Sequence, residues 1–172
     1  MILEQQMSKI VSNATPLIYL AKIKKYSLLQ SLYKKIIISQ EVKIEIVDEG
    51  KKLKKPDALL IEKEIEGGFI EVKKVGKLIV TTLELEPGEL STLSLAKELG
   101  INEVLVDETL GRTAAKIVGL IPKGTLYVLL KNLKLKKITF DDFLNILNKL
   151  IESGFRLKEE IYIKAIEEAK RI

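Results

Sequence analysis

The sequence predicts an α/β fold built around a mostly parallel sheet. Short clusters of apolar, often β-branched residues alternate with segments whose apolar residues recur at helical spacing. This alternation is typical of βαβ units. After Gly124 the pattern is helical to the end of the chain. We therefore expect a main domain over residues 7–138 and a C-terminal helical extension, residues 139–172, packed on the same domain.

Four segments have the length and composition of buried strands. They span residues 9–12, 36–38, 69–72 and 103–106. Residues 78–86 are compatible with either a strand or a loop. Pro16 suits the first turn of a helix after the first strand, and Asn13 or Thr15 is the candidate cap of that helix.

The expected helices follow from apolar spacing and from residues that start and stop helices. Gly50 is expected to end the helix after the second strand, and the lysine-rich segment 51–56 is expected to form a loop. Besides the helix at Pro16, helical patterns cover residues 27–34, 40–48, 58–65, 87–99 and 108–118, and two amphipathic stripes lie within 140–151 and 157–169.

The composition excludes several kinds of chemistry. The chain of 172 residues contains no His, Cys or Trp. Without Cys there is no disulfide framework and no thiolate nucleophile, and without His there is no Ser-His-Asp triad and no HExxH zinc site. The glycine motifs of phosphate loops and dinucleotide sites are also missing. Chemistry in this chain therefore depends on carboxylates, hydroxyls, amines or a hard metal ion held by oxygen ligands.

A moderate excess of basic residues accompanies these absences. Lys and Arg number 29 against 24 Asp and Glu, a net charge of +5, which permits a nucleic-acid partner without requiring one. Many Lys, Glu and Ile residues without Cys are typical of a heat-adapted protein from a thermophile. The chain starts without the features of a signal peptide and has no apolar run near the roughly 20 residues of a membrane span. We expect a cytoplasmic protein with no membrane segment.

Polar residues near the expected strand ends form the candidate site. In open α/β sheets, sites form beyond the carboxyl ends of strands, where the strand order reverses. Asn13 follows the first strand, and Asp107 with Glu108 follows the fourth. These positions converge if the two strands are neighbours. Glu45 and Glu89, each on a helix, can join them as oxygen ligands for Mg²⁺ or Mn²⁺.

Each of these residues also has a purely structural explanation. Glu89 in a first helical turn is favoured by the helix dipole, and Glu45 fits a solvated helix face. Asp107 is a possible helix cap, and Asn13 a possible turn residue. Spacing alone leaves both explanations open.

Four stretches, in order along the chain, resemble the PIN-domain family in its archaeal and bacterial branch, which includes VapC-like proteins. They are VSNATPLIYLAKI at 11–23, GELSTLSLAKEL at 88–99, VLVDETLGRTAA at 104–115 and GLIPKGTLYVLLK at 119–131. The resemblance implies a three-layer α/β/α fold with a parallel sheet whose first and fourth strands are neighbours. It also implies a Mg²⁺- or Mn²⁺-dependent ribonuclease, either a toxin held by an antitoxin protein or an RNA-processing nuclease, that often forms a homodimer.

The resemblance assigns roles to individual residues. Glu45, Glu89 and Asp107 match the second, third and fourth acidic positions of the family and are expected to hold the metal ion. Asn13 stands at the first position, where most nucleases of the family have Asp, and it offers an amide oxygen without charge. The polar positions that flank the pocket, and are expected to bind substrate, are matched by Thr15, Glu108 and Arg112.

Two functions follow from this mapping. The first is a metal-dependent endoribonuclease in which Asn13 assists the three carboxylates. The second is a PIN-like module that binds RNA or a protein without useful turnover, because Asn13 lowers the charge of the ligand set. The lysine-rich segments 51–55 and 131–137 also favour binding. A phosphoesterase acting on small molecules is a third possibility.

Overall fold

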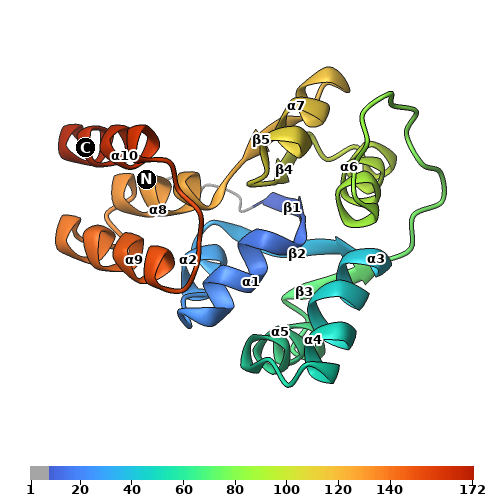
Figure 1. Cartoon of the computed structure of the whole chain (residues 1–172), viewed down its shortest axis with the longest axis horizontal. Coiled ribbons are helices and arrows are strands. Elements are labelled where there is room, and N and C mark those ends of the chain that lie inside the picture. The colour runs from blue at the N-terminus through green and yellow to red at the C-terminus, as the bar shows by residue number, and fades with distance from the viewer. Residues whose placement is uncertain (1–7) are drawn as a thin grey trace, which may run out of the picture.

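The computed structural model describes residues 8–172 (Figure 1). The expected absence of a signal peptide, and the expected start of the main domain at residue 7, concern residues outside this range. The described residues contain a five-stranded sheet in the order β3-β2-β1-β4-β5, and every neighbouring pair is parallel. The predicted α/β fold is confirmed, and so is the neighbour relation between the first and fourth strands.

The strands are short, and one of them was not predicted. Their bounds are Ser8–Ser12 for β1, Tyr33–Ser39 for β2, Ile70–Lys73 for β3, Glu103–Leu105 for β4 and Ile121–Lys123 for β5. β5 lies at an edge of the sheet, where Pro122 at its centre is tolerated. A three-residue strand around a proline leaves no apolar run in the sequence. Residues 78–86, the ambiguous segment, form no strand.

Helices occupy most of the remaining chain. α1 spans Ala14–Lys22, α2 Ser27–Gln30, α3 Gln40–Lys43, α4 Gly50–Lys52, α5 Pro56–Glu66, α6 Pro87–Leu99, α7 Thr109–Ile117, α8 Thr125–Lys134, α9 Phe140–Glu152 and α10 Glu159–Arg171. A π-helical segment, η1, spans Ile44–Glu49. The helix expected over 27–34 is wrong in its second half, because β2 begins at Tyr33 and pairs with β1 there.

The expected helix end at Gly50 is also wrong. α3, η1 and α4 follow one another without a break, and Gly50 has right-handed helical dihedrals of φ −60° and ψ −40°. A Cβ at Gly50 would lie 2.8 Å from the Cβ of Ala58 in α5. The glycine therefore allows two helices to pack closely and does not end one. Lys51 and Lys52 continue the helix in place of the expected loop.

The sheet separates two apolar cores. Ile36 and Ile38 of β2 face one core with α1, α5 and α8, whereas Ile37 between them faces the other core with α6 and α7. This alternation has the period of two that a strand requires, and it produces the three-layer α/β/α arrangement in Figure 1. Apolar side chains of α9 and α10 belong to the first core. The division of the chain at residue 138 stays a prediction. No helix within residues 8–172 is long and apolar enough to cross a membrane.

Candidate active site at the ends of β1 and β4

The candidate site lies where the strand order reverses. From β1 the chain adds β2 and β3 on one side, and it later adds β4 and β5 on the other. The carboxyl ends of β1 and β4 lie side by side, and the Asn13 backbone N–H donates to the Leu105 carbonyl at 2.9 Å. Asn13 follows β1, and Asp107 and Glu108 follow β4. Parallel pairing thus brings together residues almost one hundred positions apart.

Asn13 occupies the N-cap position of α1, but its side chain makes no capping hydrogen bond. The side chain is buried, with 4% of its surface exposed. Its Nδ2 donates to Glu108 Oε2 at 3.4 Å, and the Thr15 hydroxyl donates to Glu108 Oε1. Asn13 is thus the N-cap residue, as expected, but its side chain does not cap the helix. Its amide group instead donates to Glu108, which follows β4 in the sequence.

Glu45 reaches the same place from η1. A Cβ at Gly88 would lie 3.0 Å from Glu45 Oε2 and 3.4 Å from Asn13 Oδ1. Both oxygens therefore pack against the backbone at the start of α6, where a larger residue would fill their space. Part of the Glu45 side chain remains exposed.

The two carboxylate oxygens of Glu89 have different surroundings. Its Oε2 accepts from the Glu86 backbone N–H at 3.0 Å as part of the capping box of α6. Its Oε1 faces α7, because a Cβ at Gly111 would lie 3.0 Å from it. Glu89 is buried, with 8% exposed.

Asp107 caps a helix, but not the next one. Glu108 is the N-cap residue of α7. Asp107 instead accepts two hydrogen bonds from Thr125 at the start of α8, both 2.7 Å long. Arg112 directs Nη1 to the Val106 carbonyl at 3.0 Å. Arg112 and Glu108, one turn apart, form no ion pair among the described residues.

The carboxylates at this edge of the sheet oppose one another's ionisation. Burial raises the pKa of Glu45, Glu89 and Asp107 above their usual values. The charge of Glu108 further raises the pKa of each of these three groups. For Asp107, the Thr125 hydrogen bonds and the Arg112 charge lower the pKa without reversing the direction. A cation at this edge would relieve the repulsion.

The donor set fits a divalent cation that keeps part of its water shell. Within residues 8–172, no three Asp or Glu side chains come close enough together to form a metal site by themselves. Mg²⁺ usually retains several waters and binds proteins through one or two carboxylates. Glu45 Oε2 and Asn13 Oδ1, which share the space at Gly88, are suitable oxygen donors. The ligand set predicted from the sequence therefore remains a prediction.

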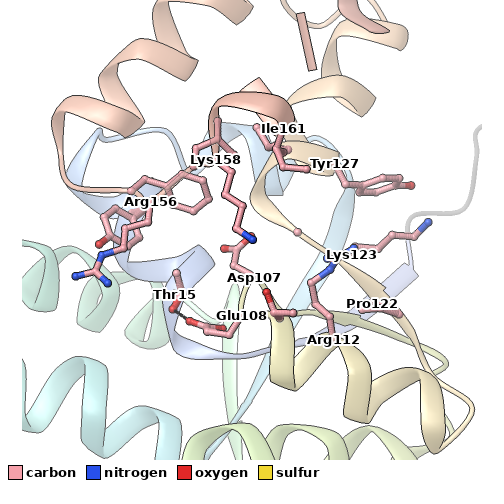
Figure 2. A pocket seen from close by; sticks show the side chains of 16 residues that line it. Thr15, Asp107, Glu108, Arg112, Pro122, Lys123, Tyr127, Arg156, Lys158 and Ile161 are labelled. Atoms are coloured by element: carbon pink, nitrogen blue, oxygen red, sulfur yellow. Dashed lines mark hydrogen bonds between the residues drawn. The ribbon is translucent and has the colours of Figure 1, made fainter. Parts of the chain in front are cut away.

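A cavity of about 1030 Å³ opens beside this acidic edge (Figure 2). Asp107 and Glu108 contribute acidic groups, and Thr15 and Arg112 line the same space. Thus four of the seven residues singled out in the sequence line the cavity. Asn13, Glu45 and Glu89 do not belong to its lining. Asn13 contacts Glu108. Glu45 packs at Gly88, and Glu89 packs at Gly111.

The sequence did not reveal the basic and aromatic walls of this cavity. They come from β5, from α8 and from the linker between α9 and α10, with Lys123, Tyr127, Phe155, Arg156 and Lys158 as lining residues. The Lys123 amino group lies 4.2 Å from the centre of the Tyr127 ring. The sequence argument considered polar residues that follow a predicted strand. It missed these residues because β5 was too short to be predicted as a strand. Neither lysine-rich segment, 51–55 or 131–137, lines the cavity.

The comparison with protein families agrees with this architecture. A family model described as a PIN domain matches residues 9–171, so the chain belongs to the PIN-domain family. No curated protein matches the sequence. PIN domains form a nuclease-type family that acts on nucleic acid and generally uses divalent metal ions. The resemblance expected from the sequence motifs is confirmed.

Proposed function

We propose that this protein is a metal-dependent endoribonuclease that hydrolyses RNA phosphodiesters. The observation that carries the proposal is the cavity. Its acidic end lies at the carboxyl ends of β1 and β4, and its walls hold the basic side chains of Arg112, Lys123, Arg156 and Lys158. Acidic groups suit a divalent cation, and basic walls suit the phosphates of an RNA strand. Membership of the PIN-domain family supports the same function.

In this proposal Glu45, Glu89 and Asp107 hold Mg²⁺ or Mn²⁺ directly or through waters that the ion keeps, and Asn13 is an uncharged auxiliary ligand. Such an ion, when bound, supplies an activated water and neutralises charge on the phosphate. Glu108 accepts from the Asn13 Nδ2, which leaves the Asn13 Oδ1 directed at the Gly88 space that Glu45 shares. The chain's own contribution is thus to orient the oxygen donors before the ion arrives.

The substrate contacts come from residues around the cavity. Arg112 lines the cavity while its Nη1 is held by the Val106 carbonyl, so its remaining guanidinium donors can bind phosphate oxygens. Thr15 fixes Glu108 through its hydroxyl. The aromatic ring of Tyr127 on the opposite wall offers a stacking surface for a base.

A cleavage assay on a mixed RNA panel with Mg²⁺ or Mn²⁺ tests the proposal. Glu45→Gln and Asp107→Asn are expected to reduce cleavage by about 100-fold or more, since both remove a proposed metal ligand. Glu41→Gln is the matched control, because Glu41 is exposed one turn earlier on the same helical segment. Its activity should equal that of the parent. Absence of cleavage with either ion, or equal cleavage by all four proteins, contradicts the proposal.

A second candidate function is RNA binding without turnover. It is favoured by the engagement of both Asp107 oxygens with Thr125 and by the neutral Asn13 at the first acidic position. Asn13→Asp distinguishes the two functions. A variant that gains metal affinity and cleavage absent from the parent identifies the native protein as a binding module. If Asn13→Asp gains neither metal affinity nor cleavage, and the parent cleaves RNA, the native protein is a nuclease.

We further propose that the protein acts in the cytoplasm and has an antitoxin or a second copy of itself as a protein partner. A small adjacent reading frame whose product binds this chain and blocks RNA cleavage would support the antitoxin. Light scattering of the purified protein measures the homodimer directly. A monomer that cleaves RNA at full rate excludes the dimer as a requirement.

A further inference from the structure

Lys158 lies on the cavity wall opposite the acidic edge. It is the N-cap residue of α10, and its side chain makes no capping hydrogen bond. Figure 2 shows the side chain reaching into the cavity toward Asp107, whereas Arg156 points to another side. Lys158 takes part in none of the ion pairs found among residues 8–172. Its ammonium group is therefore directed at the acidic end of the cavity, and no carboxylate of the described part of the chain lies within ion-pair distance of it.

The backbone that carries Lys158 is fixed against α1. Phe155 is buried, with 7% exposed, and packs edge-on against Tyr19 at a ring-centre distance of 5.3 Å. The Tyr19 hydroxyl also donates to the Gly154 carbonyl at 3.1 Å. Gly154 has φ +102°, which L residues rarely adopt. The linker between α9 and α10 is therefore anchored, and with it the position from which Lys158 enters the cavity.

The same helix holds both sides of the cavity in place. Thr15 and Tyr19 are four residues apart in α1 and share one face of the helix. Thr15 binds Glu108, and Tyr19 binds the linker before Lys158. The distance between the acidic edge and the Lys158 backbone is thus set by one rigid element.

The charges around Lys158 favour an anionic ligand in the cavity. Glu159 and Glu160, which follow it, are exposed and do not line the cavity. The acidic lining residues are Asp107 and Glu108, at the end where the metal ion is proposed to bind. The cavity lining holds four basic side chains against these two acids, so it favours an anion even without a metal ion.

We propose that Lys158 binds a phosphate of the RNA strand next to the acidic edge. The inference rests on the proposed function, because it takes RNA as the substrate. An ammonium group is a point charge that contacts phosphate oxygens without reading the base. Lys158 is therefore a substrate-binding residue that acts equally on all sequences.

Fluorescence anisotropy of labelled single-stranded oligouridylate and oligoadenylate, in EDTA to stop metal-dependent hydrolysis, tests this inference. Lys158→Ala should weaken binding of both RNAs by the same factor, roughly threefold to tenfold at low salt. The slope of log Kd against log salt concentration should fall by about 0.7, the value for one phosphate contact on a single strand. Lys158→Arg should restore most of the affinity. Lys164→Ala, an exposed lysine of α10 outside the cavity, is the control and should bind as the parent does.

The outcomes separate this inference from the proposed function. A parent that binds RNA without cleaving it overturns the nuclease, while the change in salt slope still supports Lys158. A parent that cleaves RNA, with Lys158→Ala unchanged in affinity and slope, overturns only the role of Lys158. A loss confined to one of the two RNAs, or equal to that of Lys164→Ala, also overturns it. So does a parent that binds neither RNA.

Discussion

Asp107 and Thr125 are joined by two hydrogen bonds of 2.7 Å, from the Thr125 backbone N–H to Oδ1 and from its hydroxyl to Oδ2. Thr125 is fully buried and opens α8. The pair therefore ties the end of β4 to the start of α8. Because the same carboxylate is a proposed metal ligand, one side chain serves both the fold and the site.

Thr125→Val should measure how much the Thr125 hydroxyl contributes to the stability of the fold. Valine keeps the shape and the backbone N–H but removes the hydroxyl, so we expect a loss of about 1.5–3 kcal/mol in the free energy of unfolding, the range for a hydrogen bond to a charged group. Urea denaturation measures the loss. Thr113→Val is the matched control, because Thr113 is exposed and its hydroxyl donates only to the Thr109 carbonyl. It should change stability by less than about 0.5 kcal/mol, and an equal effect of both variants would show that Thr125 has no special role.

Glu45→Gln should make the protein more stable than the parent at neutral pH. Burial and the charges of neighbouring acids raise the pKa of Glu45 from 4.5, so the native state holds this proton more tightly than the unfolded state does. The associated stability is complete below the unfolded pKa and is lost as the pH rises through the folded pKa. Glutamine, which does not ionise, avoids that loss.

The difference in thermal midpoint between Glu45→Gln and the parent, measured in EDTA, should therefore be small below about pH 4 and reach its maximum above the raised pKa. Added Mg²⁺ should stabilise the parent more than the variant at neutral pH, because binding to the native state adds to its stability. Glu41→Gln should show little difference from the parent at either pH. A difference that shrinks as the pH rises would contradict the raised pKa.

Asn13→Asp should lower the stability of the metal-free protein and raise its affinity for Mg²⁺. The change replaces the hydrogen bond from Nδ2 to Glu108 by two neighbouring carboxylates in a buried position. We expect the metal-free variant to lose about 1–3 kcal/mol in the free energy of unfolding. Calorimetric titration with Mg²⁺ should detect tighter binding than in the parent, since a charged ligand replaces a neutral one. Asn145→Asp, on the exposed face of α9, should change neither quantity, and weaker Mg²⁺ binding by Asn13→Asp would refute the ligand assignment.

Gly50→Ala tests why a glycine occurs inside a helix. Its dihedrals are helical, so alanine meets no backbone strain, but its Cβ would lie 2.8 Å from the Cβ of Ala58. We expect a loss of about 1–3 kcal/mol from overpacking. In a double-mutant cycle, Ala58→Gly should relieve the contact, so that the double variant is more stable than the sum of the single changes predicts. If the effects of the two substitutions on stability are additive, the contact with Ala58 does not cause the loss of stability in Gly50→Ala.

Much of the fold could be predicted because local chemistry and the final structure agree. α6 spans the expected residues 87–99, and Gly100 after it has the left-handed φ of +67° that suits a helix end. Prediction was wrong where packing overrides a local signal. Gly50 lies inside a helix because Ala58 packs against it, and β5 exists because β4 lies beside it to pair with. Neither partner can be read from the segment itself.

The candidate site divides in the same way. The motifs identified the acidic positions and the family, because each motif is a short run of residues with a fixed order. The partners of those residues come from other elements. Asn13 turns to Glu108 and not to its own helix, and Asp107 caps α8 and not α7. Hydrogen bonds of this kind depend on which strand ends lie together, and that is a property of the sheet order.

By itself the sequence indicated the class of fold and the family, and it excluded the kinds of chemistry that need His or Cys. Its periodicity predicted a parallel sheet between helices. Only the tertiary structure decided which side chains share the cavity. Parallel pairing of β1 with β4, and the anchoring of the linker by Tyr19, place Lys158 opposite Asp107. The reason is physical: hydrophobic spacing encodes how each segment is buried, whereas the contacts between distant segments are fixed only when all of them pack together.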